Sequence, residues 1–261
     1  MNEIIYRSLL NTLLYLSPSF NVPKVLTFHG ISNSRTNRNE LSKEVFENFI
    51  EYLIQRKFEF YKVSDYFEII KNPNAVCLTF DDGSFSNYLL GKDYLKPKNV
   101  QATFFIPTII FDKIKGDKIA NNYENGCMKE FHVKELYNLG FEIGGHSHYH
   151  KLLSELDQND LIQDIRMCKT ILENIICSEI NSFAYPYGQR NSYSKLTHEV
   201  IKEIGFKFIC TQNSTEKKNN NFVIPRIGID GRDDFNIILK KMKGKGILLN
   251  YLLNRKTVHN A

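Results

Sequence analysis

Short apolar runs alternate with longer amphipathic segments along most of this chain of 261 residues. The short runs are rich in β-branched and aromatic residues, which favour strands. They cover residues 24–31, 58–61, 75–80, 101–107, 141–145, 182–188, 206–211 and 222–230. Between them, apolar residues recur with helical spacing. This spacing predicts helices over residues 42–57, 63–71, 129–139, 157–176, 194–204 and 233–242, and one more that follows residue 83 and ends near residue 96.

Strands separated by helices predict βαβ units and a parallel sheet. This number of units favours a distorted (β/α) barrel of about seven parallel strands over an open sheet. No linker or internal repeat divides the chain, so we expect a single barrel domain over residues 24–243. An amphipathic N-terminal helix or extension is expected over residues 1–23, and a basic tail over residues 244–261.

The composition excludes several classes of protein. With 42% hydrophobic residues and a net charge of +5, the chain is too apolar and too weakly charged to be disordered. No run approaches the roughly 18–20 apolar residues that a membrane-spanning helix needs. Lysines are dispersed apart from a cluster between Lys240 and Lys245, so we expect no nucleic-acid partner.

Cysteine usage and the N-terminal segment bear on the compartment. The five cysteines are odd in number and form no CxxC pair, which indicates a reducing compartment rather than a disulfide framework. Residues 1–16 have one apolar helical face but lack the unbroken apolar stretch of a signal peptide. The sequence therefore predicts a cytoplasmic protein and leaves open weak contact with a membrane surface. It does not indicate the oligomeric state.

Two adjacent carboxylates follow the strand predicted over residues 75–80, in Thr79-Phe80-Asp81-Asp82-Gly83. On a straight strand Asp81 and Asp82 would point to opposite faces. Both reach one site only where the chain turns, which Gly83 allows. One carboxylate could then bind a metal while the other acts as a general base. The alternative is a helix N-cap with an acidic first turn.

Three of the seven histidines lie within five residues, in the segment Gly144-Gly145-His146-Ser147-His148-Tyr149-His150. His146 and His150 have the i,i+4 spacing that brings two imidazoles together on a helical turn. In an extended chain, His146, His148 and His150 would instead share one face. Both arrangements predict a divalent-metal site. Two histidines with one carboxylate would leave coordination positions open, as a hydrolytic metal requires.

Two further polar features end predicted strands. The segment Phe183-Ala184-Tyr185-Pro186-Tyr187-Gly188 closes on a turn, where the backbone N–H of Tyr187 could face a developing oxyanion. An ordinary β-turn is the alternative. His29 follows Leu26-Thr27-Phe28 near the end of the first predicted strand, which is mostly apolar. A lone histidine there is often a satisfied core residue, but in a barrel it would share the rim with the other clusters.

Taken together, TFDDG at 79–83, HSHYH at 146–150 and AYPYG at 184–188 resemble the first three motifs of the NodB-homology polysaccharide deacetylases (carbohydrate esterase family four). Their order and spacing fit over residues 24–243. The resemblance implies a distorted (β/α) barrel. It also implies a metal-dependent hydrolase that removes N-acetyl groups from an N-acetylated sugar or polysaccharide.

The resemblance implies a role for each matching residue. Asp81 corresponds to the general base of the family. The ligands of a divalent metal, with zinc as first candidate, correspond to Asp82, His146 and His150. Tyr187 corresponds to the residue whose backbone N–H joins the oxyanion hole. His148 falls on a variable position of the second motif.

The chain departs from the family pattern at several motifs. The third motif often begins with an Arg that pairs with the base, and here that position holds Ala184. The fifth usually supplies a histidine acid near the C-terminus, where only His259 is found. In the FxYPYG branch, which resembles deacetylases of poly-N-acetylglucosamine, a histidine in an early Phe-His-x-Ile segment takes that role. The resemblance therefore makes His29 the candidate general acid. The fourth motif usually carries Trp, and this chain has none.

Three other interpretations stay open. The same barrel could act as an amidase on a non-sugar amide. It could be a degenerate carbohydrate-binding module without activity. The basic C-terminal stretch could also bind nucleic acid or a membrane surface.

Overall fold

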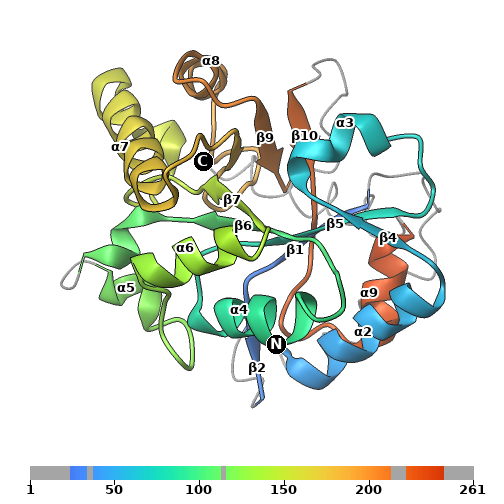
Figure 1. The fold of residues 1–261 in the computed structure, drawn as a ribbon. Helices are drawn as coiled ribbons and strands as arrows, with labels where there is room; N and C mark the ends of the chain where they lie inside the picture. The colour runs from blue at the N-terminus through green and yellow to red at the C-terminus, as the bar shows by residue number, and fades with distance from the viewer. Residues whose placement is uncertain (1–23, 34–37, 113–115, 213–221, 244–261) are drawn as a thin grey trace, which may run out of the picture.

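The computed structural model describes residues 24–33, 38–112, 116–212 and 222–243 (Figure 1). The helix expected over residues 1–23, the basic tail over residues 244–261 and His259 lie outside these ranges.

Eight parallel strands follow one another side by side in the order β10-β9-β8-β7-β6-β5-β1-β11. The strands are β1 (Val25–Phe28), β5 (Ala75–Phe80), β6 (Thr103–Ile106), β7 (Glu142–Gly145), β8 (Ser182–Ala184), β9 (Phe208–Thr211), β10 (Val223–Pro225) and β11 (Ile227–Gly228). A ninth strand, β4 (Glu59–Tyr61), pairs with the first half of β5. The strands β2 (Gly30–Ser32) and β3 (Glu40–Ser42) form a separate two-stranded sheet.

The two ends of this sheet are consecutive pieces of chain. β10 pairs with β9 and β11 pairs with β1, and only Arg226 separates β10 from β11. One short stretch therefore bridges the first and last strands, and the barrel is nearly closed. The predicted (β/α) barrel is confirmed, with eight strands where about seven were expected.

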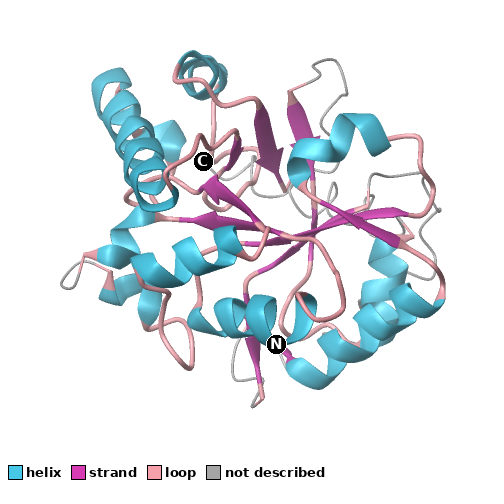
Figure 2. Cartoon of the chain, in the orientation of Figure 1, coloured by secondary structure: helices cyan, strands magenta, loops and turns pink. Residues whose placement is uncertain are grey.

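Helices lie outside the strands (Figure 2). They are α2 (Lys43–Gln55), α3 (Tyr66–Ile69), α4 (Phe85–Leu90), α5 (Asp117–Ala120), α6 (Glu130–Asn138), α7 (Gln158–Ile176), α8 (Lys195–Glu203) and α9 (Phe235–Met242). Short 3₁₀ turns occur at η1 (Val63–Asp65), η3 (Thr108–Phe111) and η4 (Leu153–Glu155), and a π-turn, η2 (Gly91–Leu95), continues α4. Among the described residues no helix combines the length and apolarity needed to cross a bilayer.

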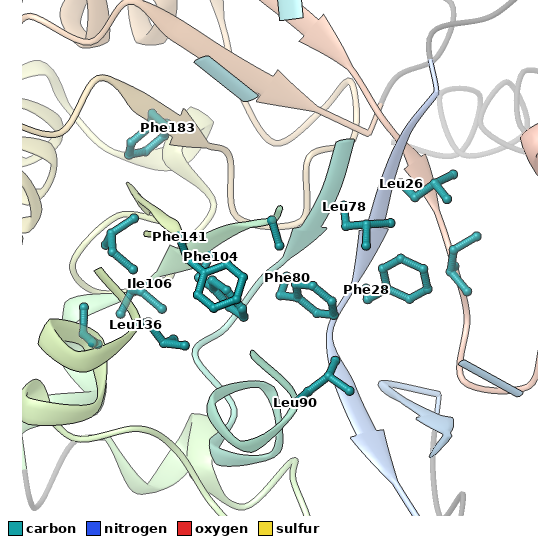
Figure 3. Packing of buried hydrophobic residues seen from close by; sticks show 14 of the residues in the cluster. Leu26, Phe28, Leu78, Phe80, Leu90, Phe104, Ile106, Leu136, Phe141 and Phe183 are labelled. Atoms are coloured by element: carbon teal, nitrogen blue, oxygen red, sulfur yellow. The ribbon is translucent and has the colours of Figure 1, made fainter. Parts of the chain in front are cut away.

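The barrel strands are rich in apolar residues because both of their faces are largely buried. In β5, Leu78 and Phe80 point outward into the layer between strands and helices (Figure 3). Their neighbours Cys77 and Thr79 point to the opposite side, into the barrel. The Phe80 ring stacks on the rings of its neighbours in β1 and β6, Phe28 and Phe104, with centroids 5.5 and 5.1 Å away. This outer layer carries most of the hydrophobic core.

The barrel interior is filled in layers. Its apolar layer contains Val25, Cys77, Phe105, Ala184, Cys210 and Ile224. The Phe105 ring lies across this layer, and a Cβ on Gly144 would come within 2.5 Å of it. Gly144 therefore makes room for the ring. The Arg226 guanidinium lies 5.2 Å from the Phe105 centroid, so this ring forms the floor beneath Arg226.

Three predicted elements differ from the structure. The strand expected over residues 24–31 breaks at His29, because the Phe28 carbonyl accepts the N–H of Asp81 and the Gly30 N–H turns to the carbonyl of Asn39. The strand expected over residues 222–230 breaks at Arg226. The helix expected over residues 63–71 is divided into η1 and α3.

Candidate active site

The predicted site residues gather at one end of the barrel. His29 follows β1, Asp81 and Asp82 follow β5, His146 follows β7, and Tyr187 lies three residues beyond β8. Because parallel strands present their carboxyl ends at the same rim, these side chains converge although they come from distant parts of the chain.

Left-handed backbone conformations shape this rim. Asp82, His150 and Tyr187 have φ angles of 69°, 53° and 63°, values that non-glycine residues seldom adopt. At Asp82 and the following Gly83 (φ 66°), the chain turns directly after β5. Both adjacent carboxylates therefore face the rim, as the predicted turn requires. Strained backbone of this kind is typical of functional sites.

Asp82 and the two motif histidines form a compact cluster. Asp82 Oδ1 lies 3.3 Å from Nε2 of His146 and 3.1 Å from Nε2 of His150. One ligand atom from each of the three residues falls within 4.8 Å of the others. The Nδ1–H of His146 donates to the Ala184 carbonyl over 2.8 Å, which directs its Nε2 lone pair toward Asp82.

This cluster fits a divalent metal. Asp82 Oδ1 is buried and has no hydrogen bond among the described residues, an arrangement that is costly without a cation. Two imidazole nitrogens and one carboxylate oxygen form a donor set that suits zinc and leaves coordination positions open.

The histidine segment adopts neither of the two predicted geometries. Residues 146–150 are neither a helical turn nor an extended strand. Ser147 has a φ of 63°, and its Oγ accepts the His150 N–H over 2.9 Å, which closes an irregular turn. His148 is outside the cluster, with its Nδ1 2.7 Å from the Thr108 hydroxyl, so the three-histidine arrangement is wrong. The carboxylate of Asp164, on α7, accepts the N–H groups of His148 and Tyr149 over 2.8 and 2.9 Å and holds the turn.

Asp81 is held separately from Asp82. Its two oxygens accept hydrogen bonds from Nη1 and Nη2 of Arg226 over 2.7 and 2.8 Å, and Arg226 also donates to the Thr79 hydroxyl. Asp81 and Arg226 are each 1% exposed. Burial is the largest single influence and raises the pKa of Asp81. The Arg226 charge, the His146 charge and the hydrogen bonds from Arg226 act together in the opposite direction, so the pKa lies below its usual value. Asp81 Oδ2 lies 4.0 Å from His146 Nε2, so the carboxylate borders the same space.

His29 and Tyr187 complete the rim. His29 is half-buried and directly follows β1 at this rim, where its backbone carbonyl accepts a hydrogen bond from the side-chain amide of Asn87. Tyr187 occupies the centre of a γ-turn closed by the Gly188 N–H and the Pro186 carbonyl over 2.7 Å, not an ordinary β-turn. Among the described residues, the N–H of Tyr187 has no hydrogen-bond acceptor. Its ring is half exposed and lies 5.1 Å from the His150 ring.

A family model described as polysaccharide deacetylase matches residues 69–209. This chain belongs to the polysaccharide deacetylase family. One curated relative, YxkH of Bacillus subtilis, has a name that places it among the polysaccharide deacetylases. It is 23% identical over 192 residues, which are 72% of this chain and 63% of the relative. The chain therefore spans less than two thirds of the length of this relative.

Solved structures share the fold. IcaB from Ammonifex degensii superposes with a TM-score of 0.70 at 21% identity, over 86% of this chain and 98% of its own. The Streptococcus pyogenes deacetylase PplD, solved with acetate, superposes with a TM-score of 0.69 at 19% identity, over 86% of this chain and 99% of its own. A de-N-acetylase from Aggregatibacter actinomycetemcomitans superposes with a TM-score of 0.67 at 17% identity, over 83% of this chain and 98% of its own.

Two residues of this deacetylase-family chain lie outside the motifs and were missed by the sequence analysis. Arg226 pairs its guanidinium with Asp81, the partnership that the resemblance implied for the motif arginine that is absent at position 184. A charged residue in the apolar run Val223–Gly228 was the available signal. Tyr123 donates its hydroxyl to Asp82 Oδ2 over 2.6 Å. Nothing in the sequence pattern indicated this contact.

Proposed function

We propose that this chain is a metal-dependent hydrolase that removes N-acetyl groups from an N-acetylated sugar or polysaccharide. The observation that carries the proposal is the pairing of two neighbouring carboxylates with different partners. Asp82 presents an unbonded, buried oxygen to two histidines, while Asp81 is paired with Arg226. In a metal-assisted hydrolase one group binds the metal and a second, separate group accepts the proton of the attacking water, and this pair of carboxylates can supply both.

Asp82, His146 and His150 would hold the metal, for which zinc is the first candidate. When bound, it would supply Lewis acidity that activates a water molecule and polarises the amide carbonyl. The other steps belong to groups of this chain.

Asp81 takes the proton of the attacking water, since its lowered pKa keeps it a carboxylate and Arg226 holds it in one orientation. The N–H of Tyr187 stabilises the oxyanion, and such a donor is typically worth about 2.7–4 kcal/mol. His29 protonates the leaving nitrogen as the C–N bond breaks. Water and the N-acetyl group thus yield acetate and a free amine.

The substrate class rests on relatives. Membership of the polysaccharide deacetylase family and the likeness to a solved de-N-acetylase favour an N-acetylated carbohydrate. The half-exposed ring of Tyr187 beside His150 offers an apolar surface on which a sugar ring could pack. An amidase acting on a non-sugar amide is the second candidate, and a degenerate binding module is the third. The complete set of candidate metal ligands argues against the degenerate module.

The test combines metal content with acetate release. After incubation with zinc, wild type should retain about one ion per chain, as the site has one ligand set, and Asp82→Ala and His146→Ala should lose it. Asp81→Asn and His29→Gln should retain the ion but release acetate from N-acetylglucosamine oligomers about 10²–10⁴-fold more slowly.

Three results would count against this proposal. Full turnover by metal-loaded Asp81→Asn would exclude Asp81 as the base. Absence of metal from zinc-treated wild type would favour the binding module instead. Release of acetate from simple amides but not from acetylated sugars would favour the amidase.

A further inference from the structure

Tyr123 belongs to none of the motifs, yet it contacts the candidate metal ligand. It lies between β6 and α6, shortly after α5, and is 5% exposed. Its hydroxyl donates to Oδ2 of Asp82 over 2.6 Å, while Oδ1 of the same carboxylate faces the two histidines. The two oxygens of Asp82 therefore have different surroundings.

We propose that Tyr123 is a positioning residue that makes Asp82 a one-oxygen ligand of the metal. The inference rests on the proposed metal site. Because the phenol occupies Oδ2, only Oδ1 is available beside the histidine nitrogens. A carboxylate bound through one oxygen takes one coordination position rather than two, which leaves more positions for water and substrate. Hydrogen-bond partners of this kind orient metal ligands in many proteins.

The surroundings of Tyr123 support this role, because they hold the ring in place. A Cβ added to Gly30 would come within 2.8 Å of both the Tyr123 ring and Cγ of Glu40, so the absence of a side chain at Gly30 lets the ring reach Asp82. The next residue, Glu124, is tied to the β2–β3 sheet: its N–H donates to Glu40 Oε1 over 3.0 Å, and its carboxylate accepts the Ser32 hydroxyl. The close packing of the Tyr123 ring and the Glu40 side chain therefore explains why a glycine stands at position 30, directly after His29.

The first test is the zinc affinity of Tyr123→Phe, measured by competition with a chromophoric chelator. This variant keeps the ring and removes only the O–H, and we expect zinc to bind about 10–100-fold more weakly. Tyr94→Phe is the matched control, since the Tyr94 hydroxyl also donates to a carboxylate, Glu51 Oε1, but between α2 and η2. Its zinc affinity should equal that of wild type.

The second test reports coordination directly. In Co²⁺-loaded protein, the visible absorption weakens as the coordination number rises. Tyr123→Phe frees Oδ2 of Asp82 to join the ion, so its Co²⁺ spectrum should be weaker than that of wild type and of Tyr94→Phe. A residue that serves only to support the fold would lower stability without this spectral change.

Circular dichroism shows whether Tyr123→Phe folds. If it does not fold, Gly30→Ala tests the same contact, because it keeps the Tyr123 hydroxyl but places a Cβ against the Tyr123 ring. It should also weaken zinc binding. If folded Tyr123→Phe binds zinc as tightly as wild type with an unchanged Co²⁺ spectrum, the inference is overturned. If wild type itself binds no metal, the proposed function fails instead, so the two failures are distinguishable.

Discussion

Asp81 and Asp82 are adjacent in the chain, yet their side chains have different partners. Arg226 binds both oxygens of Asp81, whereas Asp82 is contacted by Tyr123 on one oxygen and by histidines on the other. Burial opposes ionisation of both, but the Arg226 charge lowers the pKa of Asp81 and the His150 charge lowers that of Asp82. Both groups are therefore carboxylates at neutral pH, one suited to accept a proton and one to bind a cation.

Removal of the Arg226 guanidinium is expected to destabilise the protein by about 3–5 kcal/mol, because it leaves Asp81 buried and charged without a partner. Arg226→Met keeps much of the side-chain volume, and the free energy of unfolding of the metal-free protein can be measured with urea. The double variant Arg226→Met/Asp81→Asn has no such unpaired charge and should recover part of the loss. If the double variant is no more stable than Arg226→Met, the role of Arg226 lies in its packing on Phe105 instead.

At the scale of elements, α7 supplies the support for the histidine turn. Its buried face is apolar except for Asp164, whose two oxygens accept the N–H groups of His148 and Tyr149. A carboxylate on the buried side of an amphipathic helix requires such partners. The helix thereby links the hydrophobic core to the irregular turn that carries His146 and His150.

Asp164→Ala should weaken zinc binding about 10–100-fold, because it releases the turn and leaves two backbone N–H groups without acceptors. The control lies on the same helix: Asp157 caps α7 by accepting the Asp160 N–H over 2.9 Å. Asp157→Ala should cost about 1 kcal/mol of stability and leave zinc affinity unchanged. Equal zinc affinity in the two variants would show that the turn holds its shape without Asp164.

At the scale of the whole molecule, the alternation of strands and helices was enough to predict the barrel, and the barrel placed the polar strand ends at one rim. The turn at residues 146–150 was not predictable, because its geometry depends on left-handed backbone at Ser147 and His150 rather than on a regular period. The contacts of Arg226 and Tyr123 with the Asp pair span 145 and 41 residues. Such pairings arise only when the barrel closes and the β6–α6 segment packs beside it.

The opposite end of the barrel contains a partly buried carboxylate, that of Glu142, which links stability to pH. Glu142, Thr103 and Ser182 are the first residues of β7, β6 and β8. The Glu142 carboxylate accepts the Thr103 hydroxyl over 2.7 Å, the Ser64 N–H over 3.2 Å and the Ser182 hydroxyl. Burial is the largest influence and raises the pKa of Glu142 above its usual 4.5, although these hydrogen bonds oppose the shift. The folded protein therefore binds more protons at this site than the unfolded chain does.

Stability from Glu142 should accordingly fall as pH rises from about its usual pKa through the raised pKa of the folded state. Glu142→Gln keeps the shape and can still accept the Ser64 N–H, but it carries no charge. The unfolding free energy of Glu142→Gln minus that of wild type should therefore grow across this pH window and then level off. Urea unfolding of the metal-free proteins measures the difference, with the exposed Glu130→Gln as control. A difference that shrinks with rising pH would mean that the hydrogen bonds outweigh burial and that the folded protein favours the charged form.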